Sequence, residues 1–86
     1  MKNNQIAASF VDSLIGHGLD VSSMTQRNIE KRFMVILEME VDKKYLPFYA
    51  MSKDFVDQLV YDGLDVSAIM HRTIEREFVS FLNKQL

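Results

Sequence analysis

The chain has 86 residues, of which 48% are hydrophobic and 26% are charged, and its formal net charge is −2. This composition is ordinary for one folded domain and argues against disorder. The slight acidity provides no general attraction to nucleic acid or to anionic membranes. Cysteine is absent, which excludes disulfides and thiolate metal sites. No apolar run approaches the length needed to span a bilayer. The polar residues after Met1 do not resemble a signal peptide, so we expect a cytoplasmic protein.

The sequence repeats itself at an offset of 45 residues. When residues 10–41 are aligned without gaps to residues 55–86, 14 of the 32 pairs are identical, whereas chance would give about 2. A fixed offset without gaps indicates one supersecondary unit used twice. We therefore expect a single domain, with a first unit at about 5–41, a linker at 42–50 and a second unit at about 51–86.

Each unit has the pattern of a helix, a tight turn and a second helix. Apolar residues in the first helix of each unit recur every four residues, which predicts one buried stripe. Gly18 and Gly63 are expected to end these helices in the left-handed conformation. The second helices are expected at about 21–40 and 66–85. The Asp20 and Asp65 side chains are the preferred caps, because they place Leu19/Met24 and Leu64/Ile69 at the two positions of a hydrophobic staple.

Serines offer other capping choices. Ser22 and Ser67 are the alternative caps of the second helices, and Ser52 is the expected cap of the helix that opens the second unit. The fold class that follows is all-α, with two helical hairpins packed as a four-helix unit about a pseudo-twofold axis. The expected core consists of Phe10, Leu14, Leu19, Ile29, Phe33, Leu37, Phe55, Leu59, Leu64, Ile74, Phe78 and Leu82.

The units differ most at residues 33–41, which are apolar on nearly every side, whereas residues 78–86 are more polar. Three explanations remain open: a central helix covered by the aromatic linker, a surface for a homodimer or a partner, or a short strand at 36–41. The surplus apolar face predicts a protein interface. Its expected members are Met34, Val35, Glu38, Met39, Val41, Tyr45 and Phe48.

Signatures of catalysis and cofactor binding are missing. His17 and His71 align with Asp62 and Gln26, so the two units share no histidine site. The acidic residues that recur in both units have simpler roles as caps or in surface ion pairs. We therefore expect no enzyme activity, no cofactor and no metal. A small adaptor, inhibitor or regulator that binds another protein through an apolar helix face is the favoured class. Homodimerisation through that face is the specific hypothesis.

DNA binding is the alternative, because a helix, a glycine turn and a second helix outline a helix-turn-helix motif. In that motif the start of the second helix contacts the bases. The acidic net charge argues against it, because DNA binding depends on contacts with several phosphates. The residues suited to this role are Ser23, Gln26, Arg27, Lys31, His71 and Arg72.

Overall fold

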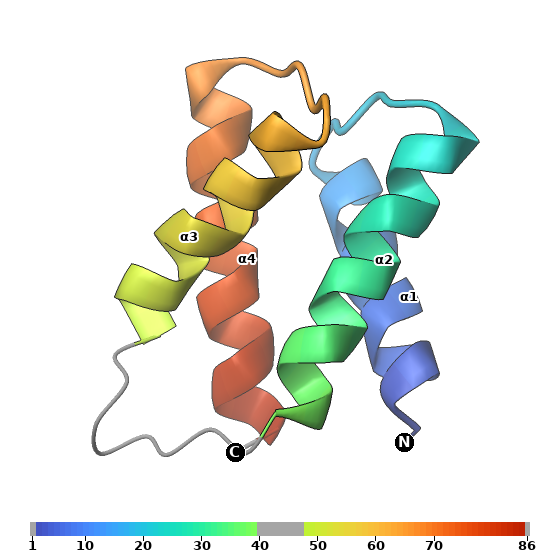
Figure 1. The fold of residues 1–86 in the computed structure, drawn as a ribbon, viewed down its shortest axis with the longest axis vertical. Helices are drawn as coiled ribbons and strands as arrows, with labels where there is room; N and C mark the ends of the chain where they lie inside the picture. Colours follow the sequence, from blue (N-terminus) through green and yellow to red (C-terminus); the bar gives the residue numbers. More distant parts are fainter. Residues whose placement is uncertain (1, 40–47, 86) are drawn as a thin grey trace.

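The computed structural model describes residues 2–39 and 48–85, which form four helices. These are α1 (Asn3–Gly16), α2 (Ser23–Glu38), α3 (Phe48–Tyr61) and α4 (Ala68–Gln85). Helices α1 and α2 form one hairpin and α3 and α4 form another; α1 also packs on α4, and α2 on α3 (Figure 1). The predicted all-α class and the two hairpins are confirmed.

Some helix boundaries differ from the predictions. Helix α3 begins at Phe48, so the second hairpin starts earlier than the predicted linker allows. Ser52 therefore lies inside α3 and does not cap it; its buried hydroxyl donates to the Tyr49 carbonyl at 2.6 Å. Residues 36–38 are helical and Met39 is extended, so the strand is wrong for this part of 36–41. Residues 40 and 41 lie outside the described ranges.

The serines, and not the aspartates, cap α2 and α4. The Ser22 hydroxyl accepts from the Thr25 amide at 3.2 Å, and the Ser67 hydroxyl accepts from the Met70 amide at 3.1 Å. Capping by Ser22 and Ser67 moves each helix start past the position that the staple requires. Met24 and Ile69 are accordingly 74% and 69% exposed, so the predicted staples are wrong.

The turns use glycine as predicted. Gly18 and Gly63 have φ values of 106° and 112°, which side chains with a Cβ rarely adopt. The amide of the residue after each glycine reaches back to the helix, from Leu19 to Leu14 O and from Leu64 to Leu59 O, each at 2.9 Å. This arrangement ends α1 and α3 sharply and buries both leucines.

The core is built around four phenylalanines. Phe10 stacks on Phe33 with ring centroids 4.2 Å apart, and Phe55 lies 4.7 Å from Phe78. An edge-to-face contact of 5.8 Å between Phe10 and Phe55 joins the two hairpins. Every residue of the predicted core is buried except Leu37, which is half-buried against the same cluster.

Candidate functional site

A groove of about 480 Å³ runs between α2 and α3. Its apolar lining includes Ile36, Met51 and Phe55, and both Ile36 and Met51 pack against the core cluster. Val35 and Met39 line the same groove and remain 54% and 49% exposed. The groove therefore offers apolar surface that no other described part of the chain covers.

Polar side chains line the rest of the groove. Helix α2 contributes Asn28, Lys31 and Arg32, and α3 contributes Asp54 and Gln58. Apolar surface combined with a few polar side chains is typical of ligand-binding sites, which include small-molecule pockets and grooves that receive a helix.

The predicted interface residues are only partly gathered at this groove. Val35 and Met39 line it, and Glu38 is exposed on the same helix. Met34 is half-buried against the core. Phe48 is 9% exposed and belongs to the core cluster, so its side chain is removed from the surface where it was expected. Val41 and Tyr45 lie outside the described residues.

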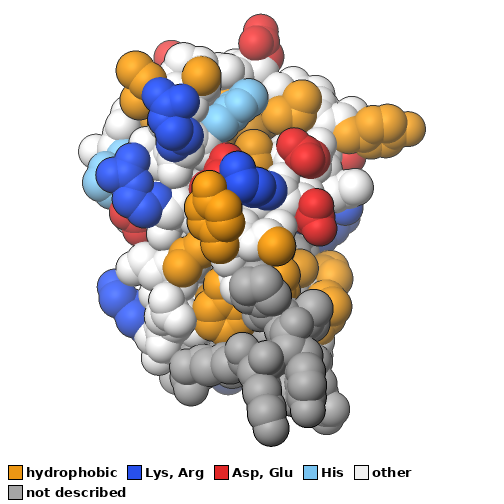
Figure 2. Space-filling view, turned by 90° about the vertical axis from the view of Figure 1, so that its left-hand side faces the viewer, with side chains coloured by type: hydrophobic (Ala, Val, Ile, Leu, Met, Phe, Trp, Pro, Cys, Tyr) orange, Lys and Arg blue, Asp and Glu red, His pale blue; other side chains and the backbone are white. Residues whose placement is uncertain are grey.

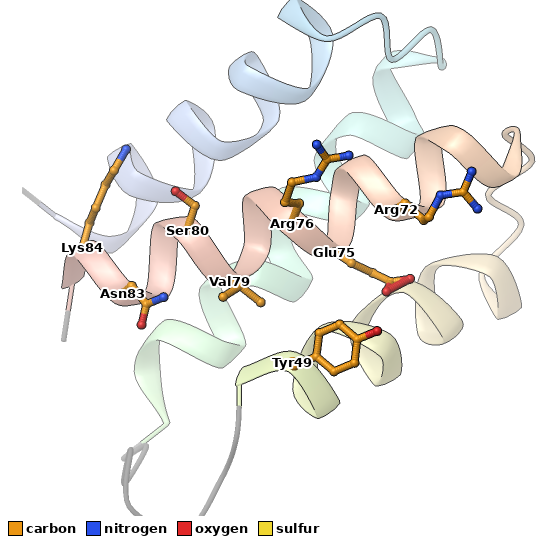
Figure 3. Close-up of a pocket in the computed structure, with 8 residues that line it drawn as sticks. All are labelled: Tyr49, Arg72, Glu75, Arg76, Val79, Ser80, Asn83 and Lys84. Atoms are coloured by element: carbon orange, nitrogen blue, oxygen red, sulfur yellow. The ribbon is translucent and has the colours of Figure 1, made fainter.

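A larger hollow, of about 730 Å³, borders α4. Its basic residues are Arg72, Arg76 and Lys84, and the α3 residue that lines it is Tyr49. Figure 3 shows that Val79 and Glu75 point toward Tyr49, whereas Arg76 and Lys84 point to the other side of α4. Because these side chains diverge, the hollow does not gather its cations around one ligand position.

The surface over α3 and α4 is mixed in character. Figure 2 shows hydrophobic, basic and acidic side chains interspersed on this side of the molecule. Part of the charge is already paired, because Lys53 Nζ lies 3.8 Å from Glu75 Oε2 and 4.9 Å from the centre of the Tyr49 ring. The α2–α3 groove is therefore the better candidate site.

Two polar clusters join the hairpins. Arg32 donates to Asp62 from Nε at 2.6 Å and from Nη2 at 2.9 Å, and Asn28 Nδ2 donates to the same carboxylate at 2.9 Å. These bonds, first from Arg32 and then from Asn28, lower the pKa of Asp62, while the bond to Asp62 raises the pKa of Arg32. In the second cluster, His17 Nε2 lies 2.8 Å from Glu77 Oε1.

Sequence reasoning missed both clusters, although the aligned units contained a signal. Positions 17 and 62 are aligned, and so are positions 32 and 77, with opposite charge at positions 32 and 77. Which side chains meet across the hairpins depends on how the helices pack, and the repeat pattern does not specify that packing.

The residues proposed for DNA contacts are in differing environments. Ser23, Arg27, Lys31 and Arg72 are exposed, whereas Gln26 and His71 are half-buried. Gln26 Nε2 donates to the Val21 carbonyl at 3.2 Å, which engages it in the local structure. Lys31 lines the α2–α3 groove and Arg72 lines the α4 hollow.

Residues 2–39 and 48–85 contain neither a cluster of metal ligands nor a helix suited to span a membrane. No three His, Asp or Glu side chains in these ranges lie close enough together to hold a metal ion. None of the described helices combines the length and hydropathy that a membrane-spanning helix requires. Comparison with known protein families, curated proteins and solved structures gives no match.

Proposed function

We propose that the chain is a non-enzymatic protein-binding domain whose α2–α3 groove receives a helix of a partner protein. The observation that carries this proposal is the exposure of Val35 and Met39 in a groove whose lining includes Phe55 and Ile36. Covering these side chains would remove apolar surface from water, which is the main favourable term in most protein association.

The dimensions of the groove support a helical partner. Its lining residues on this wall run from Asn28 in α2 to Met39, the residue that follows α2, which corresponds to roughly 16 Å at 1.5 Å per residue. This length accommodates about three turns of a partner helix, whose apolar residues would recur at spacings of three and four. Methionine side chains repack easily around different shapes, and Met39 and Met51 both line the groove.

Charge favours one class of partner helix. Lys31 on α2 and Asp54 on α3 line the groove from its two helices. A helix with an acidic residue near Lys31 and a basic residue near Asp54 would complement this arrangement, and such pairing chiefly selects partners and speeds encounter.

A second copy of this chain is the first partner to test. Met39 follows the last residue of α2, and its amide donates to the Val35 carbonyl at 3.2 Å. The two side chains are therefore one helical turn apart and form a ridge of the kind that packs into a groove. In a twofold dimer, each copy would insert this ridge into the groove of the other.

Sedimentation at micromolar concentration tests the dimer. We expect self-association of the native chain that Val35→Glu abolishes, while Met24→Glu, at an exposed apolar residue that does not line the groove, leaves it unchanged. A monomer would eliminate a second copy as the partner. Affinity capture from the native host, with and without nuclease, would then compare the same variants. The proposal is wrong if neither self-association nor any captured protein distinguishes Val35→Glu from the native chain.

We further propose that the chain is a tandem duplication with a pseudo-twofold axis between the hairpins. The Phe10–Phe33 and Phe55–Phe78 contacts support this proposal, because they join aligned positions of the two units at 4.2 and 4.7 Å. Ser22 and Ser67, also aligned, both serve as helix caps. Superposition of the backbone of residues 10–39 on residues 55–84 tests this symmetry.

DNA binding remains a second candidate because Arg27, Lys31 and Arg72 are exposed. It predicts a salt-dependent shift of duplex DNA that Arg27→Ala removes. Val35→Glu should leave such a shift intact, so the two candidate functions have separate variants.

A further inference from the structure

Among the described residues, two polar contacts between the hairpins occupy equivalent places in the repeat. One is the hydrogen bond between His17 and Glu77, and the other is the ion pair between Arg32 and Asp62. Adding the repeat offset of 45 to 17 gives 62, and adding it to 32 gives 77. The same two aligned positions therefore meet in both contacts. In one contact the carboxylate is at the second position (Glu77), and in the other it is at the first position (Asp62).

Each carboxylate has a second polar contact. Ser13 Oγ donates to Glu77 Oε2 at 3.2 Å, and Asn28 Nδ2 donates to Asp62 Oδ2 at 2.9 Å. The side chains of Glu77 and Asp62 are 22% and 21% exposed, whereas those of their partners His17 and Arg32 are 52% and 38% exposed. Partial burial and several donors make these contacts more directional than an isolated surface ion pair.

The dipoles of α1 and α3 act differently on the residues that follow these two helices. His17 follows the last residue of α1, and Asp62 follows the last residue of α3. The negative end of a helix dipole favours a cation and disfavours a carboxylate. Asp62 therefore occupies an unfavourable position, and its contacts with Arg32 and Asn28 offset this.

We infer that the exchanged charges make the N-terminal hairpin recognise the C-terminal hairpin and reject its own kind. Two N-terminal hairpins paired in the same way would place His17 against Arg32, with no carboxylate at either contact. Two C-terminal hairpins would place Asp62 against Glu77, which are like charges. Related hairpins in one chain otherwise present similar apolar faces, and repulsion of the wrong pairing is a common source of specificity.

Exchanging the charges at positions 32 and 77 should make each hairpin prefer its own kind. We call the pairing of an N-terminal with a C-terminal hairpin unlike, and the pairing of two N-terminal or two C-terminal hairpins like. In the double variant Arg32→Glu/Glu77→Arg, the unlike pairing places the introduced arginine against His17 and the introduced glutamate against Asp62. The like pairings instead bring His17 to the introduced glutamate and Asp62 to the introduced arginine. The net charge does not change, so a general charge effect is controlled. Adding His17→Asp and Asp62→His makes a quadruple variant in which the unlike pairing is again complementary at both contacts.

Sedimentation at micromolar concentration, with helix content followed by circular dichroism, tests the switch. Every variant also carries Val35→Glu, so that association through the α2–α3 groove does not contribute. We expect the double variant to associate at least about tenfold more tightly than the Val35→Glu chain, and the quadruple variant to return to the value of that chain. The inference is overturned if the double variant associates no more than that chain does, whether folded or unfolded, or if the quadruple variant associates like the double variant.

Discussion

The rings of Phe10 and Phe33 stack with their centroids 4.2 Å apart and join α1 to α2 at the centre of the core. Phe33 also contacts Phe55, Phe78 and Phe81 edge-to-face. It is fully buried, so truncation would leave a cavity that its rigid neighbours cannot fill. Phe33 is therefore the residue whose loss should damage the core most.

We expect Phe33→Ala to lower the free energy of unfolding by about 3–5 kcal/mol, a large share of the stability of a small domain. Phe33→Leu should lower it less, because more of the volume is kept. Met24→Ala, at a side chain that is 74% exposed, should change it by less than about 0.5 kcal/mol. Urea unfolding of the three variants measures these differences, and equal effects of Phe33→Ala and Met24→Ala would contradict the assigned core.

The caps can be tested by comparing serines with aspartates. Ser22→Ala and Ser67→Ala should each lower the free energy of unfolding by about 1 kcal/mol, since each removes the acceptor for an amide at the start of a helix. Asp20→Ala and Asp65→Ala should have much smaller effects, because both residues are exposed and precede the cap. Larger losses of stability in the aspartate variants than in the serine variants would show that Asp20 and Asp65 are the caps.

Three glycines should respond to alanine with different signs. Gly18→Ala and Gly63→Ala should destabilise the protein by about 1–2 kcal/mol, because both positions have a positive φ. Gly16→Ala should stabilise it by roughly 0.4–1 kcal/mol, since Gly16 lies in α1 with nothing within 4 Å of an added Cβ. Thermal and urea unfolding of the single variants provide the comparison. A destabilised Gly16→Ala would show that this helix end is strained.

The Asp62–Arg32 pair predicts a dependence of stability on pH. Because Arg32 and Asn28 lower the pKa of Asp62 below its ordinary value of 3.8, the folded state favours the charged carboxylate. The stabilisation is therefore complete above the pKa of the unfolded chain and is lost as the pH falls through the lower, folded pKa. Asp62→Asn should be less stable than the native chain at pH 7, and this difference should shrink in acid. An equal difference at both pH values would rule out an ionic contribution.

Local patterns in the sequence determined much of the fold. Spacings of four between apolar residues identified the buried face of each helix, because side chains four apart lie on one side of a helix. The prediction of Phe10, Leu14, Phe55 and Leu59 as core residues is confirmed on this basis. Gly18 and Gly63 likewise marked the turns, since the required backbone conformation is local.

The helix starts show where local reasoning was insufficient. Asp20 and Ser22 are both good capping residues, and a capping preference of about 1 kcal/mol is too small to choose between them from sequence. With Ser22 as the cap, Met24 is exposed. Leu19 is buried beneath the α1–α2 turn. The packing of this turn decides whether Asp20 or Ser22 meets the first free amides of α2.

The candidate groove was visible from the sequence only as a surplus of apolar residues on one helix. Val35 and Met39 belong to that surplus, but the opposing wall of Met51, Asp54 and Phe55 comes from α3. A helix has several apolar neighbours that could cover it, so the covered side depends on how α2 and α3 are placed. The residues of one wall were therefore predictable, and the groove itself was not.

By itself, the sequence determined an all-α chain of two helical hairpins, because apolar periodicity and glycine turns act through neighbouring residues. Tertiary structure alone decided which polar side chains meet across the hairpins: Arg32 with Asp62, and His17 with Glu77. These partners are 30 and 60 residues apart, and each contact depends on the relative placement of two packed helices. That placement is a property of the whole core, to which each residue contributes only a small part of the free energy.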